Sequence, residues 1–545
     1  MQIEKKLQGG ITQREVILIL FLITAISLSL KLYTVDFSTP LISDSTRYTL
    51  QAISISQGDF KIPSDHNLGW PIFISPFTFL IQSENFLDYS VLVRLLSISI
   101  STITIWFLYL LGKRFFDEKY SLIMVSLFAF EPHLNYISSF GFIEPLFILV
   151  FITSYYFILK QRYYSTLISF FFVGILYWLK LTSLIALVAF SIIFLINTRN
   201  FKRSLILVAC FGIFFLLIYP TMYERYEEYG NPFYFIFVDI FFVEDYSIQG
   251  KEKTSAQIYI QKHGLYPFIE KFFINGSLNV LSTLARISFP YLIFLFPIGM
   301  ILSFSQFDLD KNRVRANWTL LIISLLVMII PFASVAEKRF LYFIYPILII
   351  FATLAIKRIT EHGLNAFSFS KKKKKLFLIL LMVIILIIST LFTLRFERPD
   401  PMEEAEKTTW TKFLLRNING KITDGGYAIP YLVPVKIEES KGNFLNYKIE
   451  DQKNWPNILG GNLIYASSYG KGIEEYIKYG ESVGLRYIGI SSKGSDLFPF
   501  LDEVYMEEKK YPFLVKVYDS KDLGFQRYFV KVFEIDYKKF HNYFE

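Results

Sequence analysis

The stretch VILILFLITAISLSLKL, residues 16–32, consists almost entirely of Ile, Leu, Val and Phe, with a few small hydroxyl residues between them. A helical run of this kind is long enough to cross a hydrocarbon core of roughly 30 Å. Similar windows recur as far as residue 394, so the sequence predicts about eleven membrane spans. Within a few residues they are 16–32, 90–111, 120–137, 143–159, 164–179, 181–196, 205–219, 287–304, 318–332, 340–356 and 376–394.

The composition of the whole chain agrees with these windows. Of its 545 residues, 53% are hydrophobic and 18% aromatic, and the mean hydropathy is +0.40. Such a chain has too little polar surface to be soluble, and we expect an α-helical polytopic membrane protein. The first window lacks a small-x-small cleavage site and is long for a signal peptide, so we interpret it as an uncleaved span.

Lys and Arg are concentrated in alternate connections between the predicted spans. Because positive residues are retained on the cytoplasmic side, these connections predict that the N-terminus is inside and the C-terminal region outside a plasma membrane. The net charge of +9 is thus a topology signal and no sign of nucleic-acid binding. We interpret the lysine run 371–375 as a solvated inner anchor, with binding to anionic lipid headgroups as the alternative. The one cysteine, Cys210, excludes disulfides within the chain.

Three predicted outer regions, 33–89, 221–286 and 395–545, are too long to be simple connections. The last has the composition of a soluble domain, and its strand-like runs are NLIYASS, LRYIGISS, PFLVKVY and RYFVKVFEI, with a helical stretch between the first two. We therefore divide the chain into a membrane domain, 1–394, with catalytic outer loops 33–89 and 221–286, and an extracytoplasmic α/β domain, 395–545. No catalytic motif is found in the second domain, so a lid or acceptor-docking role is expected for it.

The first outer region contains a polar and apolar periodicity of 3.6 residues. Tyr48, Ala52 and Ile55 stand at helical spacing within 45–57, which predicts a helix at the membrane interface. Asp44 stands immediately before this helix and has two interpretations. It is either a helix N-cap or a functional carboxylate.

Several short motifs follow in order along the first part of the chain. The first reads D-x-x-x-Y-x-x-x-A, then G, then G-W-P, at Asp44, Tyr48, Ala52, Gly58, Gly69, Trp70 and Pro71. The others are Arg94 in VRLLSISIS, Glu144 in GFIEPLF, Lys180 in GILYWLKLTSL, Gly230 in YGNPFYF, and Glu337, Arg339, Phe340 and Pro346 in AEKRFLYFIYP. Together the motifs resemble the GT-C fold glycosyltransferases of the protein O-mannosyltransferase-like and aminoarabinose-transferase-like group, which use polyprenyl-phosphate sugars.

The resemblance implies a hexosyltransferase that moves a sugar, mannose or another hexose, to a hydroxyl of a glycan, lipid or protein acceptor. Asp44 matches the group's essential acid and would be the general base, with inversion at the anomeric carbon. Lys180 and Arg339 would bind the phosphate of the carrier, the arginine by a bidentate fork and the lysine as a point charge. Residues that would contact a substrate are Tyr48, His66, Trp70, Glu144 and Glu337.

Each of these residues also has a purely structural interpretation. Lys180 can extend its ammonium group to the interface, Arg339 can be an interfacial anchor, and His66 can be a solvated loop residue. Arg94 is expected to be a structural partner of a carboxylate or helix end. Asp36 is a weaker alternative to Asp44, because it lies nearer the first span and no helix follows it.

Two further functions remain open from the sequence. A metal-dependent oligosaccharyltransferase would share the architecture, and Glu131 with His133 in FEPHLN would suit Mg²⁺ or Mn²⁺. That family carries W-W-D in its outer domain, which here has only Trp410 and Trp455, so we expect no cofactor. A lipid or solute transporter is disfavoured because no internal repeat is visible. A member without activity that serves as a scaffold would have the same sequence features.

Overall fold

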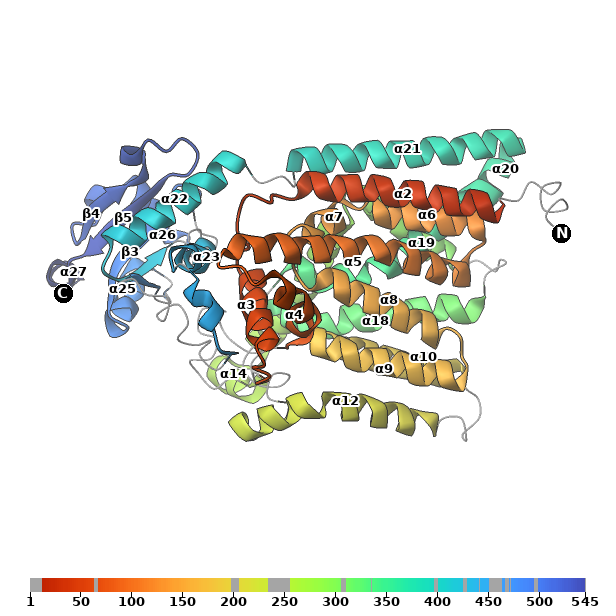
Figure 1. The fold of residues 1–545 in the computed structure, drawn as a ribbon, viewed down its shortest axis with the longest axis horizontal. Helices are drawn as coiled ribbons and strands as arrows, with labels where there is room; N and C mark the ends of the chain where they lie inside the picture. The colour runs from red at the N-terminus through yellow and green to blue at the C-terminus, as the bar shows by residue number, and fades with distance from the viewer. Residues whose placement is uncertain are drawn as a thin grey trace.

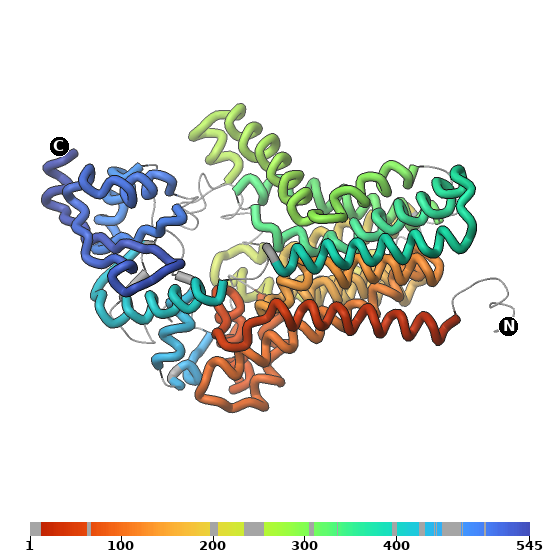
Figure 2. The backbone as a smooth tube through the Cα atoms, turned by 90° about the horizontal axis from the view of Figure 1, so that it is seen from above, coloured from red at the N-terminus to blue at the C-terminus, as the bar shows by residue number. Residues whose placement is uncertain are grey.

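The fold is described from a computed structural model. It covers residues 12–62, 67–197, 205–233, 255–304, 310–334, 336–396, 400–424, 429–440, 442–449, 463–465, 470, 472–494 and 498–544. A bundle of long, roughly parallel helices is joined to a small α/β domain (Figure 1). Figure 2 shows this domain at one end of the bundle and the start of the first described helix, α2, at the opposite end.

The bundle contains a helix for every window predicted as a span. Six helical segments in the described part are long and apolar enough to cross a membrane, or seven if a bent pair is one span. The long helices are α2 (Gln13–Thr34), α5 (Phe86–Phe115), α12 (Ile206–Tyr229), α18 (Lys311–Ser334), η3 (Lys338–Ile344) continued by α19 (Tyr345–Arg358), and α21 (Lys371–Phe396). The shorter apolar helices are α8 (Glu144–Ile158), α9 (Tyr163–Leu179) and α10 (Ser183–Asn197). An α-helical membrane fold is therefore confirmed, whereas the number of eleven spans stays a prediction.

Two predicted windows are broken in the structure. Window 120–137 divides into α6 (Glu118–Ala129) and α7 (Pro132–Ser138), because Pro132 cannot continue the helix and restricts the residue before it. Window 287–304 divides at Pro290 for the same reason. Its first two residues end α16 (Gly276–Ser288), and α17 (Leu292–Leu302) leaves at a bend of 112°.

Between the bundle and the C-terminal domain lie the shorter elements of the outer regions (Figure 1). The first region forms α3 (Asp44–Ser56) and the apolar helix α4 (Gly69–Ile81). The predicted helix 45–57 is present, but most of its side chains are buried, so it packs inside the protein and does not simply lie on its surface. The second region forms α14 (Ala256–His263), α15 (Leu265–Ile269) and η2 (Glu270–Asn275) before α16.

The C-terminal domain is built on a five-stranded mixed sheet in the order β2-β1-β3-β5-β4. Its strands are β1 (Gly420–Asp424), β2 (Leu463–Tyr465), β3 (Leu485–Ser491), β4 (Leu514–Asp519) and β5 (Val530–Ile535). β1 pairs in parallel with β2 and β3, while β5 is antiparallel to both β3, with Ile488 opposite Phe533, and β4. The four predicted strands are present and the predicted helical crossover is α25 (Ile473–Ser482), but β1 was missed.

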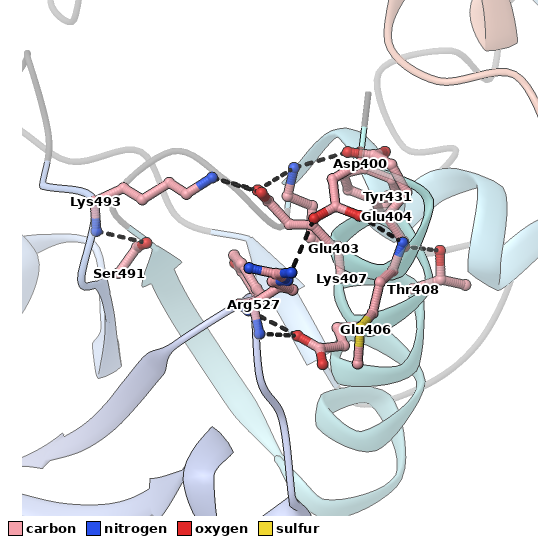
Figure 3. A network of polar contacts seen from close by, with 12 residues as sticks. Asp400, Glu403, Glu404, Glu406, Lys407, Thr408, Tyr431, Ser491, Lys493 and Arg527 are labelled. Carbon is pink, nitrogen blue, oxygen red and sulfur yellow. Dashed lines mark hydrogen bonds and ion pairs between the residues drawn. The ribbon is translucent and has the colours of Figure 1, made fainter. Parts of the chain in front are cut away.

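Helix α22 (Pro401–Asn417) connects the last membrane helix to this sheet. Its Glu406 carboxylate accepts the backbone N–H groups of Gln526, Arg527 and Tyr528 at 2.7–2.8 Å. Burial alone would raise the pKa of Glu406, but these three donors outweigh it and lower the pKa. One turn earlier, Glu403 accepts from Lys493, which follows β3 (Figure 3). These contacts hold α22 on the sheet, with α23 (Ile429–Glu439), α26 (Phe500–Met506) and α27 (Tyr537–Phe544) completing the domain.

Candidate active site

Asp44 is the first residue of α3, and the N-cap position before it is occupied by Ser43. Ser43 has a φ of 57°, which a residue with a side chain rarely adopts, and such backbone outliers are found preferentially at functional sites. The interpretation of Asp44 as the N-cap is therefore wrong. Its carboxylate instead forms ion pairs with two arginines.

The first arginine comes from a late segment of the membrane domain's sequence. Arg339, in η3, donates from Nη1 to Asp44 Oδ2 at 2.6 Å, across 295 positions of sequence. Its Nε is bonded to Glu337. The second arginine is local, since Arg47 Nη2 lies 3.7 Å from Asp44 Oδ1, one helical turn along α3.

Lys180 lies directly after α9, and its partner is Glu144, the first residue of α8. The Lys180 Nζ lies 2.5 Å from Glu144 Oε1, with side-chain exposures of 17% and 3%. Helices α8 and α9 pack side by side, which brings the end of one to the start of the other. Glu144 stands in the first turn of α8, where the helix dipole favours an acidic side chain.

Both cations and Glu144 line one small pocket, and Asp44 is bonded to Arg339 beside it. Its wall includes Glu144, Lys180, Thr182, Arg339, Phe340 and Tyr342. The ring of Phe340 lies 5.8 Å from both Lys180 Nζ and Arg339 Cζ, and Arg339 also faces Phe142 at 5.5 Å. Aromatic faces favour cations, so the ring of Phe340 stabilises both positive charges.

Asp44 lies outside the spans, and its charge state follows from its neighbours. Burial alone would raise the pKa of the carboxyl, but the charge of Arg339, then that of Arg47, outweighs burial and keeps the pKa below its ordinary value. Asp44 is therefore an anion at neutral pH. Tyr48, one turn further along α3, has its pKa raised by burial and by the charge of Asp44, so its hydroxyl stays protonated.

The G-W-P motif packs against the segments that carry Lys180 and Glu144. A Cβ on Gly69 would lie 2.6 Å from the backbone oxygen of Trp178, two residues before Lys180. Trp70 is fully buried and donates from Nε1 to the carbonyl of Gly141, three residues before Glu144. Trp70, predicted to contact substrate, thus has its side chain enclosed by protein, and the motif fixes the backbone around both members of the Lys180–Glu144 pair.

Other predicted site residues lie apart from this group. Arg94 donates to the carbonyls of Thr39 and Pro40, which agrees with a structural role. Asp36 accepts from the backbone and hydroxyl of Ser38 in a local turn. His66 lies outside the described residues.

Glu131 and His133 belong to a buried polar layer of the bundle. Glu131 caps α7, accepts from the His133 backbone at 3.3 Å and from the Tyr345 hydroxyl at 3.4 Å. The His133 ring is 6.5 Å from that of Tyr342, which lines the pocket. In the described part of the chain, no three His, Cys, Asp or Glu side chains gather in a way that could hold a metal ion.

Arg47 and Arg225 are two charged residues that sequence reasoning missed. Arg225, in α12, is 1% exposed and donates to the Tyr177 hydroxyl at 2.6 Å and to Asn67 Oδ1 at 2.9 Å. It joins α12 to α9 and to the chain just before Gly69. Arg225 stands beyond the predicted span 205–219 and beside Glu224, Glu227 and Glu228, so the local sequence indicates a solvated charged stretch and contains no signal of this burial.

The fold is shared with solved membrane glycosyltransferases. A crystal structure of the Archaeoglobus fulgidus oligosaccharyltransferase complexed with Zn and sulfate is 12% identical over 89% of this chain and 71% of that chain, with a TM-score of 0.54. The same organism's oligosaccharyltransferase AglB, in complex with an inhibitory peptide and a dolichol-phosphate, is 11% identical over 90% and 72%, with a TM-score of 0.53. ArnT from Cupriavidus metallidurans bound to undecaprenyl phosphate is 12% identical over 94% and 97%, with a TM-score of 0.48.

The architecture is thus of the GT-C type. Residues 71–223 match the family model described as dolichyl-phosphate-mannose-protein mannosyltransferase. A sequence search of curated proteins returns no significant match. Fold and family match together support a GT-C membrane glycosyltransferase that uses a lipid-linked sugar, as the motifs predicted.

Proposed function

We propose that the chain transfers a hexose from a polyprenyl-phosphate carrier to an acceptor hydroxyl on the outer face of the membrane. The observation that carries the proposal is the convergence of Asp44, Lys180 and Arg339, which are far apart in sequence. Lys180 and Arg339 line one pocket, and Asp44 is bonded to Arg339. A carboxylate and two cations are the groups that this transfer needs at one place. AglB, which shares the fold, is seen in complex with a dolichol-phosphate.

In the proposed reaction the acceptor oxygen attacks the anomeric carbon and its proton passes to the Asp44 carboxylate. The bond from the anomeric carbon to the phosphate oxygen breaks, and polyprenyl phosphate leaves with that electron pair. Lys180 and Arg339 stabilise the negative charge that gathers on the phosphate. Attack opposite the leaving group inverts the anomeric carbon.

The sugar and the acceptor are assigned only by class. The family match on residues 71–223 favours mannose or a related hexose as the sugar. A glycan, a lipid or a protein hydroxyl would each fit a general base at an outer membrane surface.

The proposal is tested by Asp44→Asn, which keeps the shape of the side chain but cannot accept a proton. Transfer of labelled sugar from lipid carrier to acceptor, measured in membranes at matched protein amounts, should fall by about 10²- to 10⁴-fold or more. Asp36→Asn is the matched control and should retain parental turnover, because the Asp36 carboxylate accepts from Ser38 and, in the described part of the chain, is bonded to neither Arg339 nor Lys180. Near-parental transfer by the Asp44 variant would show that Asp44 is not the general base.

A further inference from the structure

The cations assigned to the carrier phosphate are already paired with carboxylates. Lys180 is held by Glu144 at 2.5 Å, and Arg339 by Asp44 at 2.6 Å with Glu337 on its other side. Arg47 adds a third cation beside Asp44. Three carboxylates thus face three cations, and the formal charge of the group is zero.

A neutral group attracts an incoming phosphate weakly. The pocket is narrow and is lined by Glu144, Lys180 and Arg339 together with the rings of Phe147, Phe340 and Phe343. Lys180 and Arg339 have further N–H donors, but in so narrow a pocket an approaching phosphate oxygen competes with the carboxylate oxygens for the same two cations. The competition is strongest at the Lys180–Glu144 pair, where Glu144 is only 3% exposed and each charge–charge contact is worth more.

Glu144 has the features of a built-in competitor. It is 3% exposed, it starts α8, and its Oε2 has no hydrogen-bond partner among the described residues. One oxygen holds Lys180 while the other is unused. No step of the proposed transfer requires this carboxylate, so its burial needs a separate explanation.

We propose that Glu144 and Asp44 are counter-ions which the carrier phosphate displaces, with Glu144 acting as the positioning residue of Lys180. The inference rests on the proposed function and describes how its site is controlled. Without the donor, the carboxylates keep both cations in place, and the group as a whole has no net charge. When the phosphate arrives, Arg339 and Lys180 change partners, and Asp44 is released to the acceptor.

The exchange links base strength to donor binding. While Arg339 is bonded to Asp44, the carboxylate is a weak base, and once Arg339 has turned to phosphate the same carboxylate holds a proton more readily. After transfer, Glu144 returns to Lys180 and assists the departure of polyprenyl phosphate. The site thereby gains its base only when the sugar donor is in position.

The test measures equilibrium binding of polyprenyl phosphate to the full-length protein in detergent. Glu144→Gln keeps the size of the side chain but removes its charge, and it should tighten binding about fivefold or more, the size of a typical coupling between two ligands. Asp44→Asn should tighten binding as well, although it abolishes transfer. In multiple turnover, product inhibition by polyprenyl phosphate should be stronger in Glu144→Gln than in the parent.

A carboxylate of another ion pair provides the control. Glu118, the first residue of α6, lies 3.6 Å from Lys113 near the end of α5, and Glu118→Gln should leave the affinity unchanged. Affinity that is unchanged or weaker in a monodisperse Glu144→Gln or Asp44→Asn protein overturns the proposal. A carboxylate that competes with the carrier phosphate must weaken phosphate binding, so its removal must tighten that binding. If one variant fails to fold, the other decides.

Failure of this inference can be told apart from failure of the proposed function. Lys180→Ala with parental affinity would remove Lys180 from the phosphate site, and with it the proposed donor contact. Lys180→Ala with weakened affinity, together with Glu144→Gln of parental affinity, would leave the donor contact in place and refute the exchange alone.

Discussion

At the scale of single residues, the site is a set of charges whose partners come from distant positions. Asp44 and Arg339 are 295 residues apart and 2.6 Å from each other. The sequence could mark each as a charge at the end of an apolar stretch, where a charged side chain needs a partner or water. It could not show that the partner of each cation is a carboxylate of the same group.

The phosphate-binding roles proposed for Lys180 and Arg339 can be tested separately by substitution. Lys180→Ala and Arg339→Ala should each weaken binding of a polyprenyl-phosphate donor by about tenfold or more, since each removes a charged contact worth roughly 1.5–3 kcal/mol. Arg339→Lys should restore only part of the affinity, because a lysine cannot reproduce the bidentate fork. Donor titration of purified variants provides the measurement.

Arg416→Ala is the control for this pair, because its ion pair with Glu439 lies on the surface of the C-terminal domain. It should bind donor as the parent does. Native affinity in both site variants would remove the phosphate assignment from Lys180 and Arg339.

At the scale of elements, the site depends on how α4 approaches the end of α9. Only a residue without a Cβ allows this approach, because a Cβ on Gly69 would lie 2.6 Å from the Trp178 oxygen and 2.8 Å from the Leu179 side chain. The neighbouring Trp70 then reaches the carbonyl of Gly141. The motif G-W-P thus has a packing role in the structure, whereas the sequence analysis predicted that its Trp70 contacts substrate.

Gly69→Ala should therefore destabilise the protein by about 1–3 kcal/mol, the usual cost of overpacking a filled core. The matched control is Gly212→Ala in α12, where an added Cβ meets nothing within 4 Å, and it should be neutral or slightly stabilising. Thermal unfolding of the two variants in detergent, followed by fluorescence, measures the difference. Equal melting temperatures would show that the backbones can separate without cost.

At the scale of the whole molecule, the α/β domain sits at one end of the bundle, beyond α3 and α4 (Figure 1). Helix α3, which begins at Asp44, lies at the end of the bundle that bears this domain, and α2 begins at the other end (Figure 1). The pattern of Lys and Arg predicts that the N-terminal end is cytoplasmic. The domain and the candidate site would then face the same compartment, outside the cell.

This orientation is tested with protease added to intact cells. We expect the region after residue 400 to be cleaved, while a tag at the N-terminus is degraded only after the cells are opened. A cytoplasmic tag protein in the same cells shows that the membrane stayed closed. Protection of the C-terminal domain in intact cells, with cleavage after lysis, would reverse the orientation.

The sequence by itself determined what depends on composition and on local periodicity. Apolar windows predicted the positions of the membrane helices, and strand-like runs predicted four of the five strands. Ordered motifs predicted the class of transferase. Each of these signals lies within a few neighbouring residues. It missed β1, a strand of five residues, and it joined α6 to α7 although Pro132 stands between them.

Only the tertiary structure decided which side chains meet. It placed Arg339 on Asp44 and Glu144 on Lys180, enclosed Trp70, and separated Asp36 and Arg94 from the group. Ion pairs and packing contacts are made between surfaces brought together by folding, and no spacing along the chain encodes the distance between them. A charge at a helix end shows that a partner is required, and the fold alone selects that partner.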